Sequence, residues 1–118
     1  MTRRSSELYL SEMLASMNKI ERYINGVTYD EFIKQDQLVD AVERNIEKIG
    51  EAAAAIPDTI RKQHPEIPWK TMVGLRNKVI HHYFAINYEI LYQIAVKNIP
   101  KTKPMIENII KKYSTKSE

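Results

Sequence analysis

The chain has 118 residues, no cysteine and a net charge of +3 at neutral pH, and its length predicts a single domain over residues 1–118. The lack of cysteine excludes disulfides, thiolate metal sites and cysteine nucleophiles. The longest apolar run, residues 52–56, is much shorter than the roughly 18 residues of a membrane span, and the basic N-terminus precedes no apolar signal core, so we expect a cytoplasmic protein without membrane contact.

Charge is distributed unevenly along the chain. Residues 1–57 carry seven Lys and Arg against ten Asp and Glu, a net charge of −3. Residues 58–118 carry eleven Lys and Arg against five Asp and Glu, a net charge of +6. The basic half favours an anionic partner such as a nucleic acid or a nucleotide, although a solvated basic surface explains the charge equally well.

The N-terminal segment shows the apolar spacing of an amphipathic helix. Ser5 or Ser6 is predicted to cap this helix. Its inward residues recur every three or four positions: Leu10, Met13, Met17, Ile20 and Ile24. Gly26 is placed to end it in a left-handed conformation. Thr28 and Glu31 then form a predicted capping box for a short helix.

A second long helix is predicted to begin at an Asp36 cap and to stop at Pro57. Its inward residues repeat the same spacing: Val39, Val42, Ile46, Ile49, Ala53 and Ile56. This alternation is typical of the seam of an antiparallel hairpin or bundle. Glu43, Glu47 and Glu51 form an acidic row beside it, which we interpret as solvated, with metal or basic-partner binding as the alternative.

The C-terminal half is predicted to continue with short and long helices. Residues 58–63 form a short helix, and residues 64–68 form a stiff connector that leaves His64 at the surface. A helix beginning at Trp69 turns Met72, Leu75 and Val79 inward.

Asn87 caps the next predicted helix, and Pro100 interrupts it. Its inward residues are Ile90, Leu91, Ile94 and Ala95. A last helix turns Ile106, Ile109, Ile110 and Tyr113 inward. Residues 114–118 are expected to form a frayed tail. With no alternating β pattern, the prediction is an all-α fold, an antiparallel bundle of four to five helices.

One nine-residue segment, residues 76–84, concentrates the groups that can do chemistry near neutral pH: an arginine, an asparagine, two histidines and a tyrosine. His81 can take or give a proton, and Arg76 is a forked donor suited to phosphate oxygens. Asn77 can orient an imidazole or hold a substrate. With no metal-ligand cluster evident, the set predicts metal-independent cleavage of RNA by its own 2′-hydroxyl, with no cofactor.

Helix geometry limits how these residues cooperate. Arg76 and Tyr83, seven residues apart, fall on one face of a continuous helix, whereas Arg76 and His81 are about 140° apart. Either the helix opens near His81, or a second copy of the chain completes the site. A two-fold homodimer would gather two arginines and two histidines in one cleft.

The segment resembles the R-x4–6-H motif of the HEPN superfamily and, within it, the R-N-x3-H-x-Y pattern of the HepT-like toxins. Arg76, Asn77, His81 and Tyr83 match that pattern. Residues 49–52 (Ile-Gly-Glu-Ala) and 65–69 (Pro-Glu-Ile-Pro-Trp) extend the resemblance over most of the chain.

The resemblance implies a helical homodimer with a cleft lined by the motif from both chains. It also implies an endoribonuclease toxin with Arg76, His81 and Asn77 in the active site. The implied partner is a minimal nucleotidyltransferase antitoxin that transfers AMP onto Tyr83. His82 stands where relatives often carry Glu and competes with His81 for the catalytic role, but the spacing to the tyrosine favours His81.

A non-catalytic alternative stays open. In it the helical subunit only binds a nucleotide or a nucleotidyltransferase partner. Arg76 would then be a surface or interface residue paired with a carboxylate such as Glu51, and the histidines would be solvated cations at a helix end. Tyr83 would pack at the rim of the core. Loss of growth arrest on mutation of His81 would distinguish the ribonuclease hypothesis from the non-catalytic one.

Overall fold

The computed structural model describes residues 3–80 and 87–116, with side chains described for residues 6–75 and 87–113. These residues form seven α-helices and one π-helix, in this order: α1 (Arg3–Ile24), α2 (Tyr29–Ile33), α3 (Asp36–Ala55), α4 (Asp58–Gln63), α5 (Trp69–Ile80), α6 (Tyr88–Gln93), η1 (Ile94–Asn98) and α7 (Ile99–Lys116). No strand occurs in the two described ranges. The predicted all-α class is therefore confirmed.

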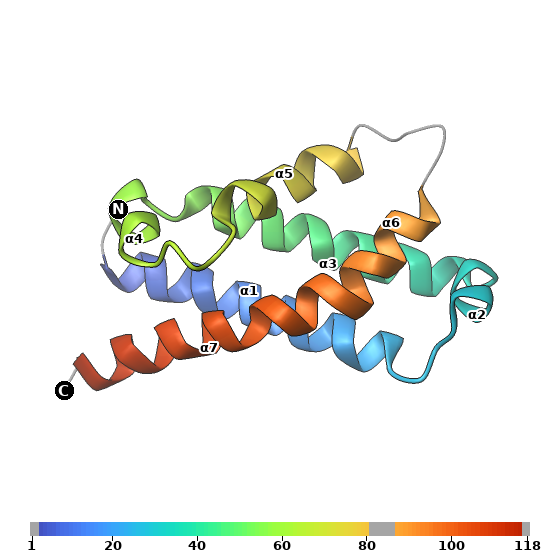
Figure 1. The fold of residues 1–118 in the computed structure, drawn as a ribbon, viewed down its shortest axis with the longest axis horizontal. Coiled ribbons are helices and arrows are strands. Elements are labelled where there is room, and N and C mark those ends of the chain that lie inside the picture. Colours follow the sequence, from blue (N-terminus) through green and yellow to red (C-terminus); the bar gives the residue numbers. More distant parts are fainter. Residues whose placement is uncertain (1–2, 81–86, 117–118) are drawn as a thin grey trace.

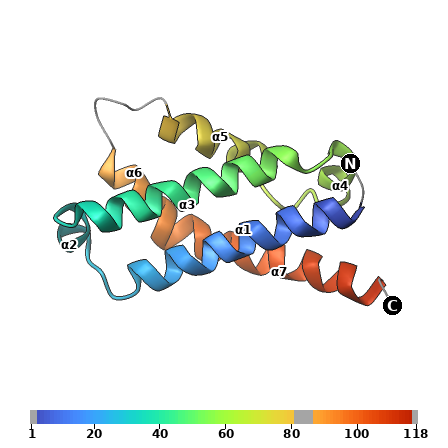
Figure 2. The ribbon, with the colours of Figure 1, turned by 180° about the vertical axis from the view of Figure 1, so that it is seen from behind.

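The long helices run antiparallel along the 47 Å axis of the molecule (Figures 1 and 2). α1 packs against α3 and α7, and α5 packs on α3. Lys103 Nζ lies 2.6 Å from Glu21 Oε1 and links α7 to α1. α6, η1 and α7 follow one another without a break and form the fourth long member of the bundle.

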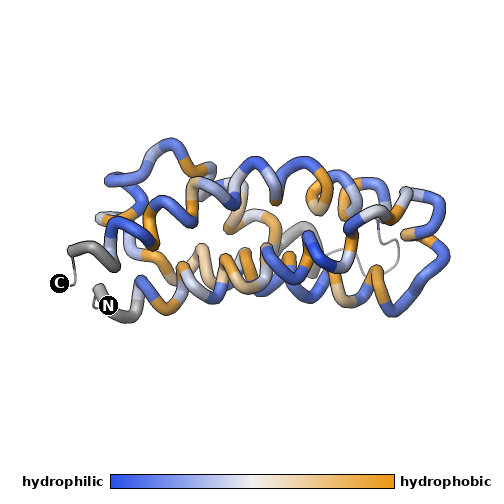
Figure 3. Tube along the Cα trace, turned by 90° about the horizontal axis from the view of Figure 1, so that it is seen from below, coloured by the Kyte–Doolittle hydropathy of each residue, from blue (hydrophilic) through white to orange (hydrophobic). Residues whose placement is uncertain are grey.

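The core consists of the apolar stripes that the sequence predicts. Every residue of the first two stripes is buried, and Leu10, Met13, Met17, Val42 and Ile46 have no exposed surface. Figure 3 shows apolar segments recurring between hydrophilic ones along the helices. Gly26 has the left-handed φ of 72° expected at a helix end.

Only some of the helix caps predicted from the sequence are present in the structure. The predicted capping box is confirmed, with Thr28 Oγ1 accepting from Glu31 N–H at 3.2 Å. α1, however, begins at Arg3, so neither serine caps it. Ser6 is fully buried, because packing overrides the local preference of serine for a cap.

The predicted Asp36 cap of α3 is wrong. The N-cap is Gln35, which makes no side-chain capping bond. Its Nε2 instead donates to Glu31 O at 3.1 Å and ties the end of α2 to the start of α3. Asp36 occupies the first turn, where its carboxylate lies favourably near the positive end of the helix dipole.

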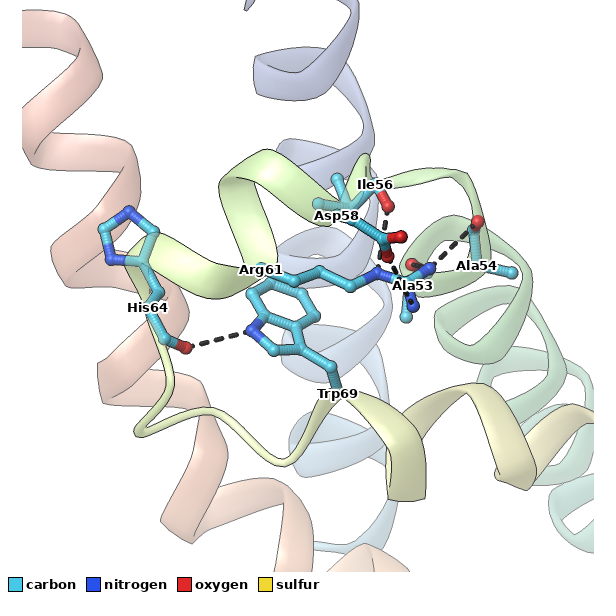
Figure 4. Close-up of polar contacts among 7 residues, drawn as sticks. All are labelled: Ala53, Ala54, Ile56, Asp58, Arg61, His64 and Trp69. Carbon is cyan, nitrogen blue, oxygen red and sulfur yellow. Dashed lines mark hydrogen bonds and ion pairs between the residues drawn. The ribbon is translucent and has the colours of Figure 1, made fainter.

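α4 and the connector after it form a hydrogen-bonded corner at one end of the bundle (Figure 4). Arg61 donates from Nε to Ile56 O at 2.9 Å and from Nη2 to Ala53 O at 3.0 Å and Ala54 O at 3.1 Å. These three carbonyls lie at the end of α3, where helical carbonyls commonly lack backbone donors. Ala53 O also accepts from the backbone N–H of Ile56 at 3.2 Å. Arg61 therefore caps α3.

His64 is buried, with 8% of its surface exposed, so its predicted surface position is wrong. The carbonyl of His64 accepts a hydrogen bond from Trp69 Nε1 at 2.9 Å (Figure 4). This hydrogen bond holds Trp69, at the start of α5, against His64, the first residue of the connector. A bond between residues five apart has no periodic signature in the sequence.

Replacing Arg61 by methionine is expected to lower the free energy of unfolding by about 1.5 kcal/mol, because three carbonyls lose a charged donor at a partly exposed site. Urea denaturation measures the change. Lys62→Met, at the exposed neighbouring position, is the matched control. Equal effects of the two substitutions would show that Arg61 does not act as a cap.

The predicted interruption at Pro100 is also wrong. Pro100 has no N–H to give to the carbonyl of Val96, yet the helix continues from Tyr88 to Lys116. η1 accommodates the proline by widening one turn, and the N–H of Ile99 donates to Ile94 O five residues back. α7 then extends three residues into the segment 114–118 that was expected to be a frayed tail.

Candidate functional site

The predicted motif begins in the last turns of α5. Arg76 and Asn77 belong to this helix, which ends at Ile80. The side chains of both residues, and all of His81, His82 and Tyr83, lie outside the described residues. Their mutual geometry therefore remains a prediction, and the described structure defines the elements on either side of it.

The start of α5 is fixed by buried contacts. Trp69 opens the helix, and its indole N–H is bonded to His64 O. Met72 and Leu75 are 4% and 8% exposed, as predicted. The helix packs along α3. The chain that leads into Arg76 thus has a defined position and direction.

α6, the helix after the motif, is held by contacts with α2 and with the connection between α1 and α2. Asn87 caps α6 as predicted, because its Oδ1 accepts from the N–H of Ile90 at 3.0 Å. Tyr92 Oη donates to Val27 O at 2.7 Å. Its ring also lies 5.5 Å from that of Tyr29 and 5.5 Å from that of Phe32. Tyr92 therefore anchors α6 to the α1–α2 connection.

A groove of about 340 Å³ lies between α5 on one side and α6, η1 and α7 on the other. One wall comes from the start of α5, and the other comes from α6, η1 and the start of α7, while Met17 of α1 and Ile49 of α3 line it as well. The lining residues of the two walls are Pro68, Thr71, Met72 and Leu75 on one side, and Glu89, Ile90, Gln93, Ile94, Asn98, Ile99 and Thr102 on the other.

Ile90 corrects another prediction. It was expected to point into the core but is 39% exposed, and it lines the groove instead. Leu75, on the opposite wall, directly precedes Arg76 in α5. The groove therefore extends to the residue that precedes the motif, and its wall is apolar and partly exposed.

The acidic row on α3 shows no sign of a metal centre. Burial, followed by repulsion from Asp40 and Glu47, raises the pKa of the Glu43 carboxyl. Glu51 is exposed. Within the described ranges, no three His, Asp or Glu side chains gather closely enough to hold a metal ion. Glu51 alone of the three is exposed, whereas Glu43 and Glu47 are half-buried, so the predicted solvated row holds only in part.

One buried polar group was not singled out by the sequence. Asn45 of α3 is 6% exposed, and its Nδ2 donates to Ala41 O at 2.8 Å. Its Oδ1 is buried and makes no hydrogen bond within the described part of the chain. The spacing of apolar residues shows Asn45 only as a polar residue between apolar neighbours. It does not reveal that the side chain is buried.

Comparison with known proteins gives a consistent result. The model of the family described as Ribonuclease HepT-like matches residues 13–109. A protein of Methanocaldococcus jannaschii named "Putative RNase MJ0127" is 39% identical over 118 residues, covering 100% of this chain and 98% of the relative. "Probable ribonuclease HepT" of Thermococcus cleftensis is 33% identical over 109 residues, covering 92% of this chain and 99% of the relative. No solved structure matches significantly.

In the parts of the chain that are described, no helix combines the length and the hydropathy needed to cross a membrane. The family match runs from the middle of α1 through α3 and the motif segment to residue 109 in α7. With the relatives aligned over nearly their whole length, this chain belongs to the HepT-like family of the HEPN superfamily.

Proposed function

We propose that this chain is a metal-independent endoribonuclease and the toxin of a toxin–antitoxin pair. The observation that carries the proposal is the pattern of Arg76, Asn77, His81 and Tyr83 in a chain of the HepT-like family. The names of its relatives support RNA as the substrate. The basic C-terminal half supports an anionic substrate.

The proposed reaction is an attack of an RNA 2′-hydroxyl on the adjacent phosphate. One histidine removes the hydroxyl proton, and a protonated histidine returns a proton to the departing 5′-oxygen. Arg76 offsets the charge that accumulates on the phosphorane, and Asn77 orients the imidazole of His81. The products are a 2′,3′-cyclic phosphate and a 5′-hydroxyl. The test is incubation of the purified protein with RNA in EDTA beside His81→Ala, and cleavage by the wild type alone is expected.

The proposal includes a homodimer, because two proton carriers are needed and Arg76 and His81 diverge on a single helix. Gly74 supports an interface on α5. A glycine inside a helix costs roughly 0.5–1 kcal/mol relative to alanine, yet a Cβ atom at Gly74 would meet nothing within 4 Å. Among the described elements, α5 makes extensive contact with α3 only. The open space at Gly74 leaves room for close approach of a second copy.

Gly74 variants test this arrangement. Gly74→Leu is expected to shift the protein from dimer to monomer, because a bulky side chain would block the approach of the partner. Sedimentation velocity measures the change, and Ser11→Leu, at an exposed position of α1, is the control. In Gly74→Ala, the free energy of unfolding of the monomer should rise by roughly 0.5–1 kcal/mol, because alanine favours a helix more than glycine does. A fully active wild-type monomer, or a Gly74→Leu variant that dimerises normally, would contradict the proposal.

We also propose that a minimal nucleotidyltransferase regulates the site by attaching AMP to Tyr83. The new phosphodiester carries one negative charge that can pair with Arg76 and occupy the place of an RNA phosphate. The adenosine would obstruct entry of the RNA. Both effects inhibit the enzyme without unfolding it.

Intact mass after co-expression with the cognate nucleotidyltransferase tests this regulation. AMP additions are expected on the wild type and on Tyr29→Phe, an exposed tyrosine control, and should fall away in Tyr83→Phe. RNase activity of the wild type should fall as the AMP load rises. If Tyr83→Phe acquires the full load and loses activity with it, another residue is the switch.

A further inference from the structure

The π-helix η1 gives the wall of the groove an arrangement that an α-helix would not. Residues five apart lie about 140° apart around an α-helix, whereas an i to i+5 hydrogen bond closes about one turn over five residues. Ile94 and Ile99, joined by this bond, both line the groove. Gln93 and Asn98, also five apart, line the groove too. The widened turn thus brings two carboxamide side chains to one cavity.

The chemistry of the lining favours an uncharged, flat ligand with a polar edge. Among the lining residues that the structure describes, no side chain is cationic, and Glu89 is acidic. A phosphate is therefore disfavoured in the groove itself. Met72, Leu75 and Ile90 offer apolar surfaces, and the carboxamides of Gln93 and Asn98 each offer donors and an acceptor. Bases carry neighbouring donors and acceptors that Asn and Gln side chains recognise.

The size of the groove separates the possible occupants. At about 340 Å³, it lies near the lower limit of small-ligand sites, roughly 300–1,000 Å³. One turn of a helix, about 10 Å across and 5.4 Å long, would more than fill it. A second copy would therefore enter the groove only with side chains of one helix face, whereas a single base fits as a whole.

We propose that this groove binds one unpaired base of the RNA substrate and that Gln93 and Asn98 hydrogen-bond its edge. RNA is the ligand on the basis of the proposed function, which this inference deepens by adding a specificity site. The base lies between Met72 and Leu75 of α5 and Ile90 of α6. Because Leu75 precedes Arg76 in the chain, the phosphate next to that base would lie toward the motif. Sequence-specific recognition of single-stranded RNA commonly uses bases held in this way.

The test compares short single-stranded RNAs that differ in one base beside the cleavage site. Wild-type protein is expected to cleave them with unequal kcat/KM, and the ratio of best to worst base should fall about tenfold or more in Gln93→Leu and Asn98→Leu. Asn108→Leu removes an exposed carboxamide from α7 outside the groove and should leave the ratio unchanged. Equal preference in the wild type and both groove variants would overturn the inference while leaving the ribonuclease proposal intact.

A binding measurement separates the two proposals. Fluorescence polarisation of the same RNAs on His81→Ala protein reports base preference without cleavage, so it remains informative even if the wild type cleaves nothing. If a groove variant is poorly folded, 4-thiouridine in the RNA should still photocrosslink to residues 88–102 of the wild-type chain, and crosslinks confined to other regions would overturn the inference. A shift of Gln93→Leu from dimer to monomer with unchanged base preference would assign the groove to a second copy instead.

Discussion

Replacing His81 by alanine is expected to abolish RNA cleavage. The proposed reaction moves one proton from the 2′-hydroxyl and one to the 5′-oxygen, and general acid–base catalysis of this kind contributes typically 10²–10⁴-fold for each group. In a two-fold dimer, one substitution removes His81 from both copies and therefore both proton carriers. The measurement is the initial rate of cleavage of a labelled RNA.

His82→Ala is the matched control, since it removes the same side chain one position later. We expect this variant to retain most of the activity, because Tyr83 is two residues after His81, as the family pattern requires. Circular dichroism on both variants checks that the helical fold is kept. Loss of activity in His82→Ala with activity retained in His81→Ala would transfer the catalytic role to His82.

Replacing Arg76 by alanine is expected to raise the activation free energy by about 2–4 kcal/mol, which slows cleavage roughly 30- to 1,000-fold. The reason is that a guanidinium stabilises the additional charge of the phosphorane more than that of the ground-state phosphate. The loss should therefore appear in kcat, with a smaller change in KM. Arg76→Lys should restore only part of the rate, because lysine keeps the charge but not the forked donor.

Arg44→Ala serves as the matched control, since it removes an exposed arginine from α3. A loss of net positive charge weakens RNA binding in both variants, but only the active-site arginine should lower kcat. If the two substitutions change kcat and KM alike, Arg76 acts through long-range attraction and not through the transition state.

Much of the fold can be read from the sequence where the deciding contacts are periodic or local. The apolar stripes of α1 and α3 predicted their buried residues, because a step of three or four places side chains on one helix face. The capping box of Thr28 and the cap at Asn87 were also predictable, since their partners lie three residues away. These are contacts within one element.

Predictions from the sequence failed where hydrogen bonds outside the regular helical pattern, or contacts between distant segments, decide the structure. Pro100 indicated a break, but the π-helix keeps the chain helical by shifting one hydrogen bond. His64 was assigned to the surface, but its carbonyl receives the indole N–H of Trp69. Ile90 fits the inward pattern of α6, yet it borders a groove. The first two outcomes rest on hydrogen bonds between residues five apart, which periodicity does not reveal, and only the third depends on how distant segments meet.

For the candidate site, too, one part was predictable from the sequence and another part was not. The motif residues are predicted from their types and spacing alone, and their side chains lie outside the described residues. The groove could not be predicted, because its lining combines residues as distant in the chain as Met17, Ile49 and Thr102. Only the packing of α5, α7 and the two N-terminal long helices brings them together.

The most direct test of the ribonuclease proposal is the chemistry of the cleaved ends in the absence of metal. Purified protein is incubated with a single-stranded RNA in excess EDTA, and the products are analysed by mass spectrometry. The account predicts cleavage that leaves 2′,3′-cyclic phosphate, or its hydrolysed form, together with 5′-hydroxyl ends. A substrate with 2′-deoxyribose at the scissile position should resist cleavage. Activity that requires added magnesium, or products with a 5′-phosphate, would contradict the account.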